Sequence, residues 1–93
     1  MITAIALVDA DVARIPEVCE EVAAIDGVTE VYSVTGDTDL VAMVRVRRHE
    51  DLAEVIADRI GKVPGVVGTR TYIAFRTYSE HDLAQAFSIG AED

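Results

Sequence analysis

Short apolar segments alternate with helical repeats along the chain and predict four strands and two helices. Residues 2–8 are apolar apart from Thr3. This run is short and unpunctuated, which indicates a strand covered on both faces. Residues 28–35, 40–46 and 66–75 are rich in β-branched and aromatic side chains and predict three further strands.

Two helices are predicted between these strands because apolar residues recur three and four positions apart. The first begins near Pro16, which suits the first turn of a helix, and the second begins at the polar residues 49–51. Gly27 and Gly65 then turn the chain into the next strand. The apolar positions are Ile15, Val18, Cys19, Val22 and Ala23 in the first helix and Leu52, Val55, Ile56 and Ile60 in the second.

Both halves of the chain repeat one order of elements, a strand followed by a helix and a second strand. Two right-handed crossovers joined by a hairpin predict a ferredoxin-like βαββαβ domain of the α+β class, with a four-stranded antiparallel sheet and two helices on one face. Residues 2–8 and 40–46 are apolar on both sides of the strand and are expected at the centre of the sheet. Residues 28–35 and 66–75 carry more polar side chains, as edge strands do.

The second face of this sheet is expected to need a partner. The chain has 93 residues, which is one domain with a modest core, yet 51% of them are hydrophobic. Because two helices cover only one face, packing of two sheets in a homodimer is the simplest way to cover the other. We expect this domain to occupy residues 1–78. Residues 79–93 are expected to form a short helix, with Leu83 and Phe87 on one side, and an acidic tail.

The charge balance argues against direct binding to nucleic acid. Seventeen acidic and eight basic residues give a formal net charge of -9, which repels phosphate. The local cluster of Arg45, Arg47 and Arg48 is interpreted as the polar end of a strand. Cys19 is the only cysteine, so a reducing compartment is expected. The first residues carry no basic leader and their apolar run is far shorter than the ~20 residues of a membrane span, which predicts a cytoplasmic protein without membrane contact.

Residues 34–40 concentrate polar chemistry in a tight turn between two apolar strands. Gly36 can adopt a positive φ, and Asp37 and Asp39 are expected to close the hairpin through local hydrogen bonds from side chain to backbone. An amino acid is a zwitterion, so its pocket needs N–H donors for the carboxylate and carboxylates for the ammonium group. A glycine turn flanked by aspartates offers both. We therefore expect Asp39→Ala to remove such binding while the dimer stays folded, because the turn is expected to be exposed.

In combination these features resemble the effector-binding domain of the Lrp/AsnC (feast/famine) regulators, also called the regulation of amino acid metabolism domain. The resemblance spans essentially the whole chain. It implies a dimeric α/β barrel, further assembly into rings that are commonly octamers, and an effector, usually an amino acid, bound between dimers. The segments that carry it are Ile25-Asp26-Gly27-Val28, then Val31-Tyr32-Ser33-Val34-Thr35-Gly36-Asp37-Thr38-Asp39-Leu40, and Pro64-Gly65-Val66-Val67-Gly68-Thr69-Arg70-Thr71-Tyr72-Ile73.

The resemblance also implies which residues hold the effector. The family's ligand-binding turn maps onto Thr35, Gly36, Asp37 and Asp39, and a threonine of its last strand maps onto Thr71. The usual regulator carries a helix-turn-helix before this domain, whereas here the first strand begins at the first residue. The chain therefore resembles a stand-alone member that acts in transcriptional regulation of amino acid metabolism without a DNA-binding domain of its own, with full-length Lrp/AsnC regulators as potential partners.

Two other functions stay open. The same fold hosts small dimeric enzymes of the antibiotic-biosynthesis monooxygenase type. We predict no enzyme and no catalytic residue, since His49 and His81 fall at expected helix starts among acidic residues, where a surface imidazole is commoner, and no nucleophile has an evident partner. No cofactor and no metal site are predicted, because apolar residues follow Asp37 and Asp39 where a calcium loop needs oxygen ligands. The second is an assembly partner that joins full-length regulators without sensing a ligand.

Overall fold

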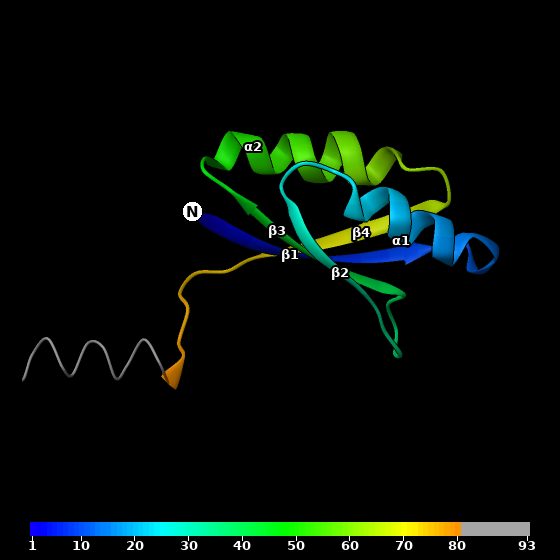
Figure 1. Cartoon of the computed structure of the whole chain (residues 1–93), viewed down its shortest axis with the longest axis horizontal. Coiled ribbons are helices and arrows are strands. Elements are labelled where there is room, and N and C mark those ends of the chain that lie inside the picture. Colours follow the sequence, from blue (N-terminus) through cyan, green and yellow to red (C-terminus); the bar gives the residue numbers. More distant parts are fainter. Residues whose placement is uncertain (81–93) are drawn as a thin grey trace, which may run out of the picture.

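A computed structural model describes residues 1–80 and shows one antiparallel sheet with its helical segments on a single face (Figure 1). The strands lie in the order β2-β3-β1-β4, so β1 and β3 occupy the centre. This arrangement confirms the predicted ferredoxin-like α+β fold. The strands are β1 (Ile2–Ala10), β2 (Val28–Ser33), β3 (Leu40–Val46) and β4 (Val66–Ile73). The helical elements are η1 (Val12–Arg14), α1 (Ile15–Ala23), α2 (His49–Ala53), η2 (Glu54–Arg59) and η3 (Ile60–Lys62).

The core lies between the sheet and the helical segments. Alternate residues of the two central strands point into it, and Ala6 of β1 stands opposite Ala42 of β3. These small side chains leave room for branched residues of the helices above them. The fully buried residues of the core are Ala4, Ala6, Val8, Val18, Val22, Leu40, Ala42, Val44 and Ile60. One expected core residue, Ala23, is exposed because it lies about 100° around α1 from the buried Val22, outside the apolar stripe.

Elements differ from the sequence expectation in four places. β1 extends to Ala10, two residues beyond the expected end. β2 ends at Ser33, two residues early, although the next N–H, that of Val34, still donates to the carbonyl of Asp39 (3.0 Å). β4 ends at Ile73, which stands opposite Ala4, two residues before the expected end. The second helix is one helical segment, but only α2 is α-helical; η2 has π-helical geometry and η3 is 3₁₀. The helix expected around Leu83 and Phe87 lies outside the described residues.

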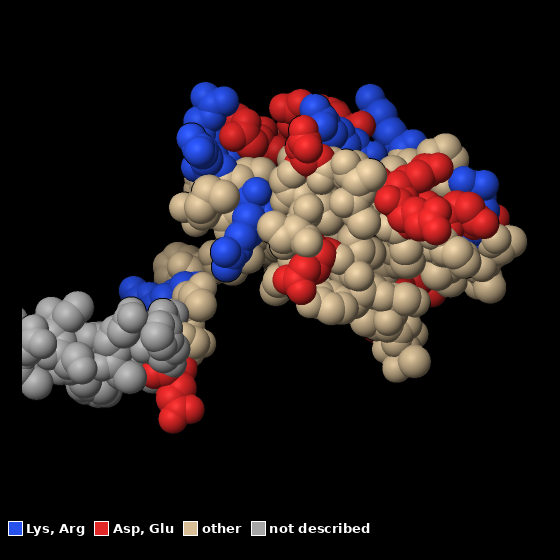
Figure 2. Space-filling model, viewed as in Figure 1, with Lys and Arg blue, Asp and Glu red and all other residues tan. Residues whose placement is uncertain are grey.

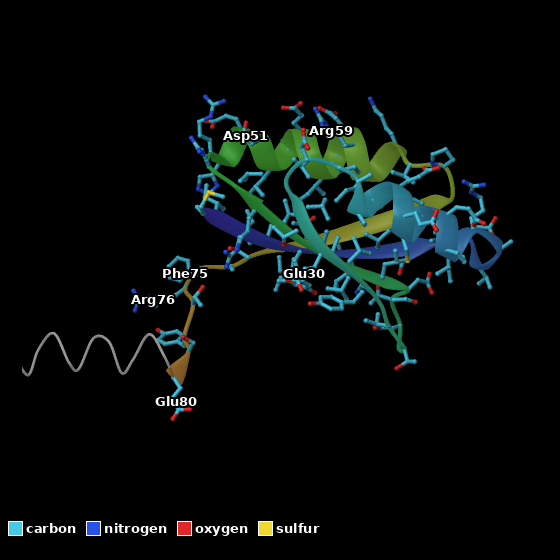
Figure 3. All side chains as sticks on the ribbon, in the orientation of Figure 1. Glu30, Asp51, Arg59, Phe75, Arg76 and Glu80 are labelled. Carbon is cyan, nitrogen blue, oxygen red and sulfur yellow. The ribbon has the colours of Figure 1, made fainter. Side chains whose placement is uncertain are left out.

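The sheet surface that faces away from the helices is called here the open face. Register and alternation place ten side chains of this face in rows across the strands, and Asp9 follows Leu7 on the same face. One row is Glu30, Met43, Ile5 and Tyr72, the next is Tyr32, Val41, Leu7 and Arg70, and Arg45 stands opposite Thr3. Figure 3 shows Glu30 on this side of the sheet and Asp51 and Arg59 on the helical side. The Tyr32 hydroxyl donates to the Glu30 carboxylate, and this bond and the charge of Glu30 raise the pKa of Tyr32.

Gly65 makes the turn between the second helical segment and β4. Its φ is 102°, in the region that favours glycine, and its carbonyl accepts a hydrogen bond from the Asp11 N–H (2.7 Å). The residue is also closely packed. A methyl group built at this position would lie 2.9 Å from Val18 Cγ2 and 3.1 Å from Arg14 Cβ. Both the backbone conformation and the space therefore require glycine here.

The variant Gly65→Ala is expected to destabilise the domain more than Gly36→Ala. Both changes force a positive φ on alanine, at a cost of about 1–3 kcal/mol, and only Gly65→Ala adds overpacking, since nothing lies within 4 Å of a methyl group at Gly36. The free energy of unfolding should fall by at least about 1 kcal/mol more for Gly65→Ala. Urea unfolding at equal protein concentration measures both values, and equal losses would contradict the packing assigned to Gly65.

Candidate functional site

The turn between β2 and β3 is the candidate effector site, and it projects from the molecule. Figure 1 shows its tip extending from the sheet on the side away from the helices. Thr35, Gly36 and Asp37 are exposed, and Gly36 has a φ of 132°, as the sequence predicted for a positive value. The tip thus presents backbone groups and one free-standing carboxylate to the solvent, where a ligand or a neighbouring subunit can reach them.

Thr38 and Asp39 anchor this turn to the central strand β1. The Asp39 carboxylate accepts from the backbone N–H of Ala10 (2.9 Å), and the Asp39 N–H donates to the carbonyl of Val8 (3.2 Å). The Thr38 hydroxyl, which is buried, donates to the same carbonyl (3.3 Å). The prediction that the Asp39 side chain makes a local hydrogen bond within the hairpin is therefore wrong, because this side chain bonds to the backbone of β1. Asp39 is also half-buried rather than exposed, because it lies between the loop and β1.

The structure brings together four of the five residues implied as ligand contacts. The turn contains Thr35, Gly36, Asp37 and Asp39. Thr71 lies instead on the edge strand β4, where it pairs with Ala6 of β1, and β1 separates β4 from β3. Thr71 lies on the helical side of the sheet, in a hollow of about 220 Å³ that Leu52 and Ile56 also line. Within one chain, Thr71 therefore lines a different place from the turn.

Asp9 is a candidate that the sequence analysis missed. It lies on β1 between Val8 and Ala10, the two residues whose backbone groups bond to Thr38 and Asp39. Its own carboxylate is partly buried beside β4, where a methyl group built at Gly68 would lie 4.0 Å from Asp9 Oδ2. The signal in the sequence was a single carboxylate at the end of an otherwise apolar strand. Asp9 adds a second acidic group beside the base of the turn.

Other titratable groups offer no competing site in the described part of the chain. Burial, together with the charge of Glu20, raises the pKa of the Cys19 thiol, which therefore stays protonated and poorly nucleophilic at neutral pH. His49 is exposed at the start of α2. Residues 1–80 contain no group of three or more His, Cys, Asp or Glu side chains arranged to hold a metal. Over the same residues, no helix is long and apolar enough to cross a membrane.

A further hollow of about 230 Å³ lies on the helical side, between the Asp26–Gly27 turn, the end of β3 and the second helical segment. Acidic and basic side chains share its lining, and Arg59 pairs there with Glu54 (3.1 Å). Figure 2 shows acidic and basic side chains mixed over the helical segments. Exposed pairs of this kind contribute little binding energy, so this hollow is a weaker candidate than the turn.

Comparison with known proteins identifies the family. Residues 3–84 match the model of the Lrp/AsnC ligand binding domain. The chain is 38% identical over 74 residues to the HTH-type transcriptional regulator FL11 of Pyrococcus horikoshii, and the match covers 80% of this chain and 48% of the regulator. It thus spans about half the length of the curated relatives it matches.

Solved structures agree with this assignment. TTHA0845 from Thermus thermophilus is 42% identical, with a TM-score of 0.82, and the match covers 86% of this chain and all of that one. A transcriptional regulator from Neisseria meningitidis, solved as a complex with L-Met, shares the fold at 16% identity and a TM-score of 0.76, over 85% of this chain and 53% of that one. The chain belongs to the Lrp/AsnC ligand-binding domain family, and its curated relative FL11 is a transcriptional regulator.

Proposed function

We propose that this domain binds an amino acid and assembles into oligomers in the service of transcriptional regulation in the cytoplasm, and that it is not an enzyme. Its family membership supports the regulatory role, and the L-Met complex of the Neisseria meningitidis regulator supports an amino acid as the ligand. The net charge of -9 makes these residues poor ligands for DNA. The DNA contact of the regulatory system is then made by other parts, such as full-length Lrp/AsnC regulators.

The observation that carries the assembly proposal is the apolar open face. Ile5, Leu7, Val41 and Met43 at its centre are only partly buried by the chain itself, and Tyr32 and Tyr72 at its edges are 48% and 56% exposed. A contiguous apolar surface flanked by polar side chains is typical of an interface. Because the face is a sheet, a second sheet can pack on it at about 10 Å, giving a homodimer that assembles further into a ring such as an octamer.

The turn supplies the ligand chemistry of the proposed site. Asp37 and Asp9 offer carboxylates for an ammonium group, and the exposed backbone at Thr35 and Gly36 offers N–H donors for a carboxylate. Asp39 acts as a positioning residue, since its carboxylate already accepts from Ala10. A neighbouring dimer that covers the tip would exclude water and could bring a Thr71 from another chain. Ligand binding and assembly are then thermodynamically linked.

A carboxylate placed in the centre of the open face should prevent dimer formation. In Ile5→Glu the charge faces Met43 and Tyr72, and the two-fold symmetry of the dimer would bury it twice without a partner. The dissociation constant should rise by at least about 100-fold. Val12→Glu, on the exposed turn η1, is the control and should remain dimeric. Analytical ultracentrifugation with circular dichroism makes the comparison, and a dimer of unchanged affinity in Ile5→Glu would refute assembly through this face.

The amino acid ligand is expected to stabilise the assembled protein. At a ligand concentration of 100 times Kd the gain is about 2.7 kcal/mol, which corresponds to a rise of several degrees in Tm. Thermal-shift measurements with each of the common amino acids should show this rise for one or a few, and Asp37→Asn should weaken it. Stabilisation by none of them would favour an assembly partner that senses nothing, and turnover of an aromatic substrate would favour a monooxygenase-type enzyme.

Substitutions of Asp39 should affect stability before they affect binding. Asp39→Ala leaves the partly buried Ala10 N–H without an acceptor and should cost about 1–3 kcal/mol of unfolding free energy. Asp39→Asn keeps an acceptor oxygen and should cost less, and Asp37→Ala, at the exposed tip, should stay within about 0.5 kcal/mol. Chemical unfolding of the three variants tests this order. Equal stability of Asp39→Ala and Asp37→Ala would show that the anchor to β1 contributes nothing.

A further inference from the structure

We propose that Phe75 of one copy fills a hollow on the open face of a second copy, so that two identical aromatic contacts lock the dimer. The inference rests on the open-face dimer proposed above and goes beyond it, because it fixes the direction of the two-fold axis and names the side chain that inserts. Its grounds are an exposed aromatic residue, a hollow of suitable size and chemistry, and their positions relative to one residue of β1.

The chain leaves the sheet after β4 as an extended segment, residues 74–79, called here the arm. The Ala74 N–H donates to the carbonyl of Thr3 (2.8 Å), which fixes the root of the arm beside the start of β1. Figure 1 shows the arm, in orange, leaving on the side of the sheet opposite the helices, and Figure 3 shows Phe75 near its root. Phe75 is 98% exposed and Tyr78 is 71% exposed. Such large apolar side chains are expected to find cover in the assembled protein.

The hollow that we assign to Phe75 lies on the open face. It has a volume of about 250 Å³ and is lined by Thr3, Thr29, Glu30, Met43 and Arg45. A cavity of about 150 Å³ is large enough to hold a benzene ring, so the space suffices for a phenylalanine side chain. The lining also suits an aromatic ring, because a methionine sulfur and an arginine guanidinium both make favourable contacts with one.

Thr3 relates the hollow to the arm. On one side it pairs with Arg45 of β3, which lines the hollow, and on the other side its carbonyl holds Ala74 at the root of the arm. The hollow and the arm therefore lie at the same level along the strands, on opposite sides of β1. A two-fold axis that runs parallel to the strands, between two packed sheets, places the β4 side of one copy over the β2 side of the other. Positions along the strands stay the same under this rotation. It brings Phe75 of each copy over the hollow of the other, which is an isologous contact.

The charges of the open face favour the same axis. With the axis parallel to the strands, β2 of one copy lies over β4 of the other. Glu30 then lies in the row of the partner's Tyr72 and one row from the partner's Arg70, on the same edge of the interface. With the axis perpendicular to the strands, β2 would lie over β2 and the two Glu30 carboxylates would share one edge. Opposite charges across an interface fix its register, and like charges oppose it.

The variant Phe75→Trp tests the insertion directly, because the chain contains no tryptophan and the new side chain is the sole reporter. Its emission should shift to the blue as rising protein concentration converts monomer to dimer, with the same midpoint as the mass transition from ultracentrifugation. Val12→Trp is the matched control, since Val12 is 79% exposed on η1 away from the open face, and its emission should not change. A dimer in which the Phe75→Trp emission stays that of a solvent-exposed side chain would overturn the insertion and leave the open-face dimer standing. A protein that stays monomeric at all concentrations would overturn both.

Binding energies and a cross-link provide the second test. Phe75→Ala removes two aromatic contacts per dimer and should raise the dissociation constant by about 100-fold or more. Tyr78→Ala, on the same arm, should raise it much less, and an equal effect of the two variants would overturn the assignment of the hollow to Phe75. In a Cys19→Ser background, the pair Met43→Cys and Phe75→Cys should form a disulfide-linked dimer on mild oxidation. A bridge that forms only within one chain would contradict the exchange of arms.

Discussion

The structure depends on one unequal arrangement: a sheet whose two central strands are apolar on both sides is covered by helices on one side alone. Alternate residues of β1 and β3 are buried beneath α1 and the second helical segment, and the residues between them face outward with only partial cover. Within residues 1–80 both helical segments lie on that one side, so no described element covers the other. Exposed apolar area of this kind favours association, and this is the physical basis of the proposed dimer.

The sequence predicted the features that local pattern determines. The period of the apolar residues located both helical segments, and short apolar runs rich in β-branched and aromatic residues located β1 to β4. The apolar character of residues 2–8 and 40–46 placed β1 and β3 at the centre. What it missed depends on contacts between distant residues. The acceptor role of Asp39 toward Ala10 spans 29 positions, and no rule for turns anticipates it. The π-helical geometry of η2 and the early end of β2 were also not predicted, since residue propensities alone indicate neither.

The candidate site shows the same division. A tight glycine turn with carboxylates could be recognised from composition and spacing, and the structure places Gly36 and Asp37 at its exposed tip. Asp9 could not be recognised, since its proximity to the turn follows from the pairing of β1 with the residues around Leu40. Thr71 came from resemblance alone, and in a single chain it lines another hollow, beneath α2. A site shared between subunits leaves only part of its chemistry visible in one of them.

The arm and the tip of the β2–β3 hairpin both extend on the open side of the sheet, from opposite ends of it (Figure 1). The hairpin tip differs from an ordinary loop in its attachment, because Thr38 and Asp39 hold three bonds to the backbone of Val8 and Ala10. Those bonds join the tip to β1, a central strand that is paired with a neighbour on each side. A force applied to the tip, by a bound molecule or an adjoining subunit, is therefore transmitted through these bonds to the middle of the sheet. An unattached loop would bend instead.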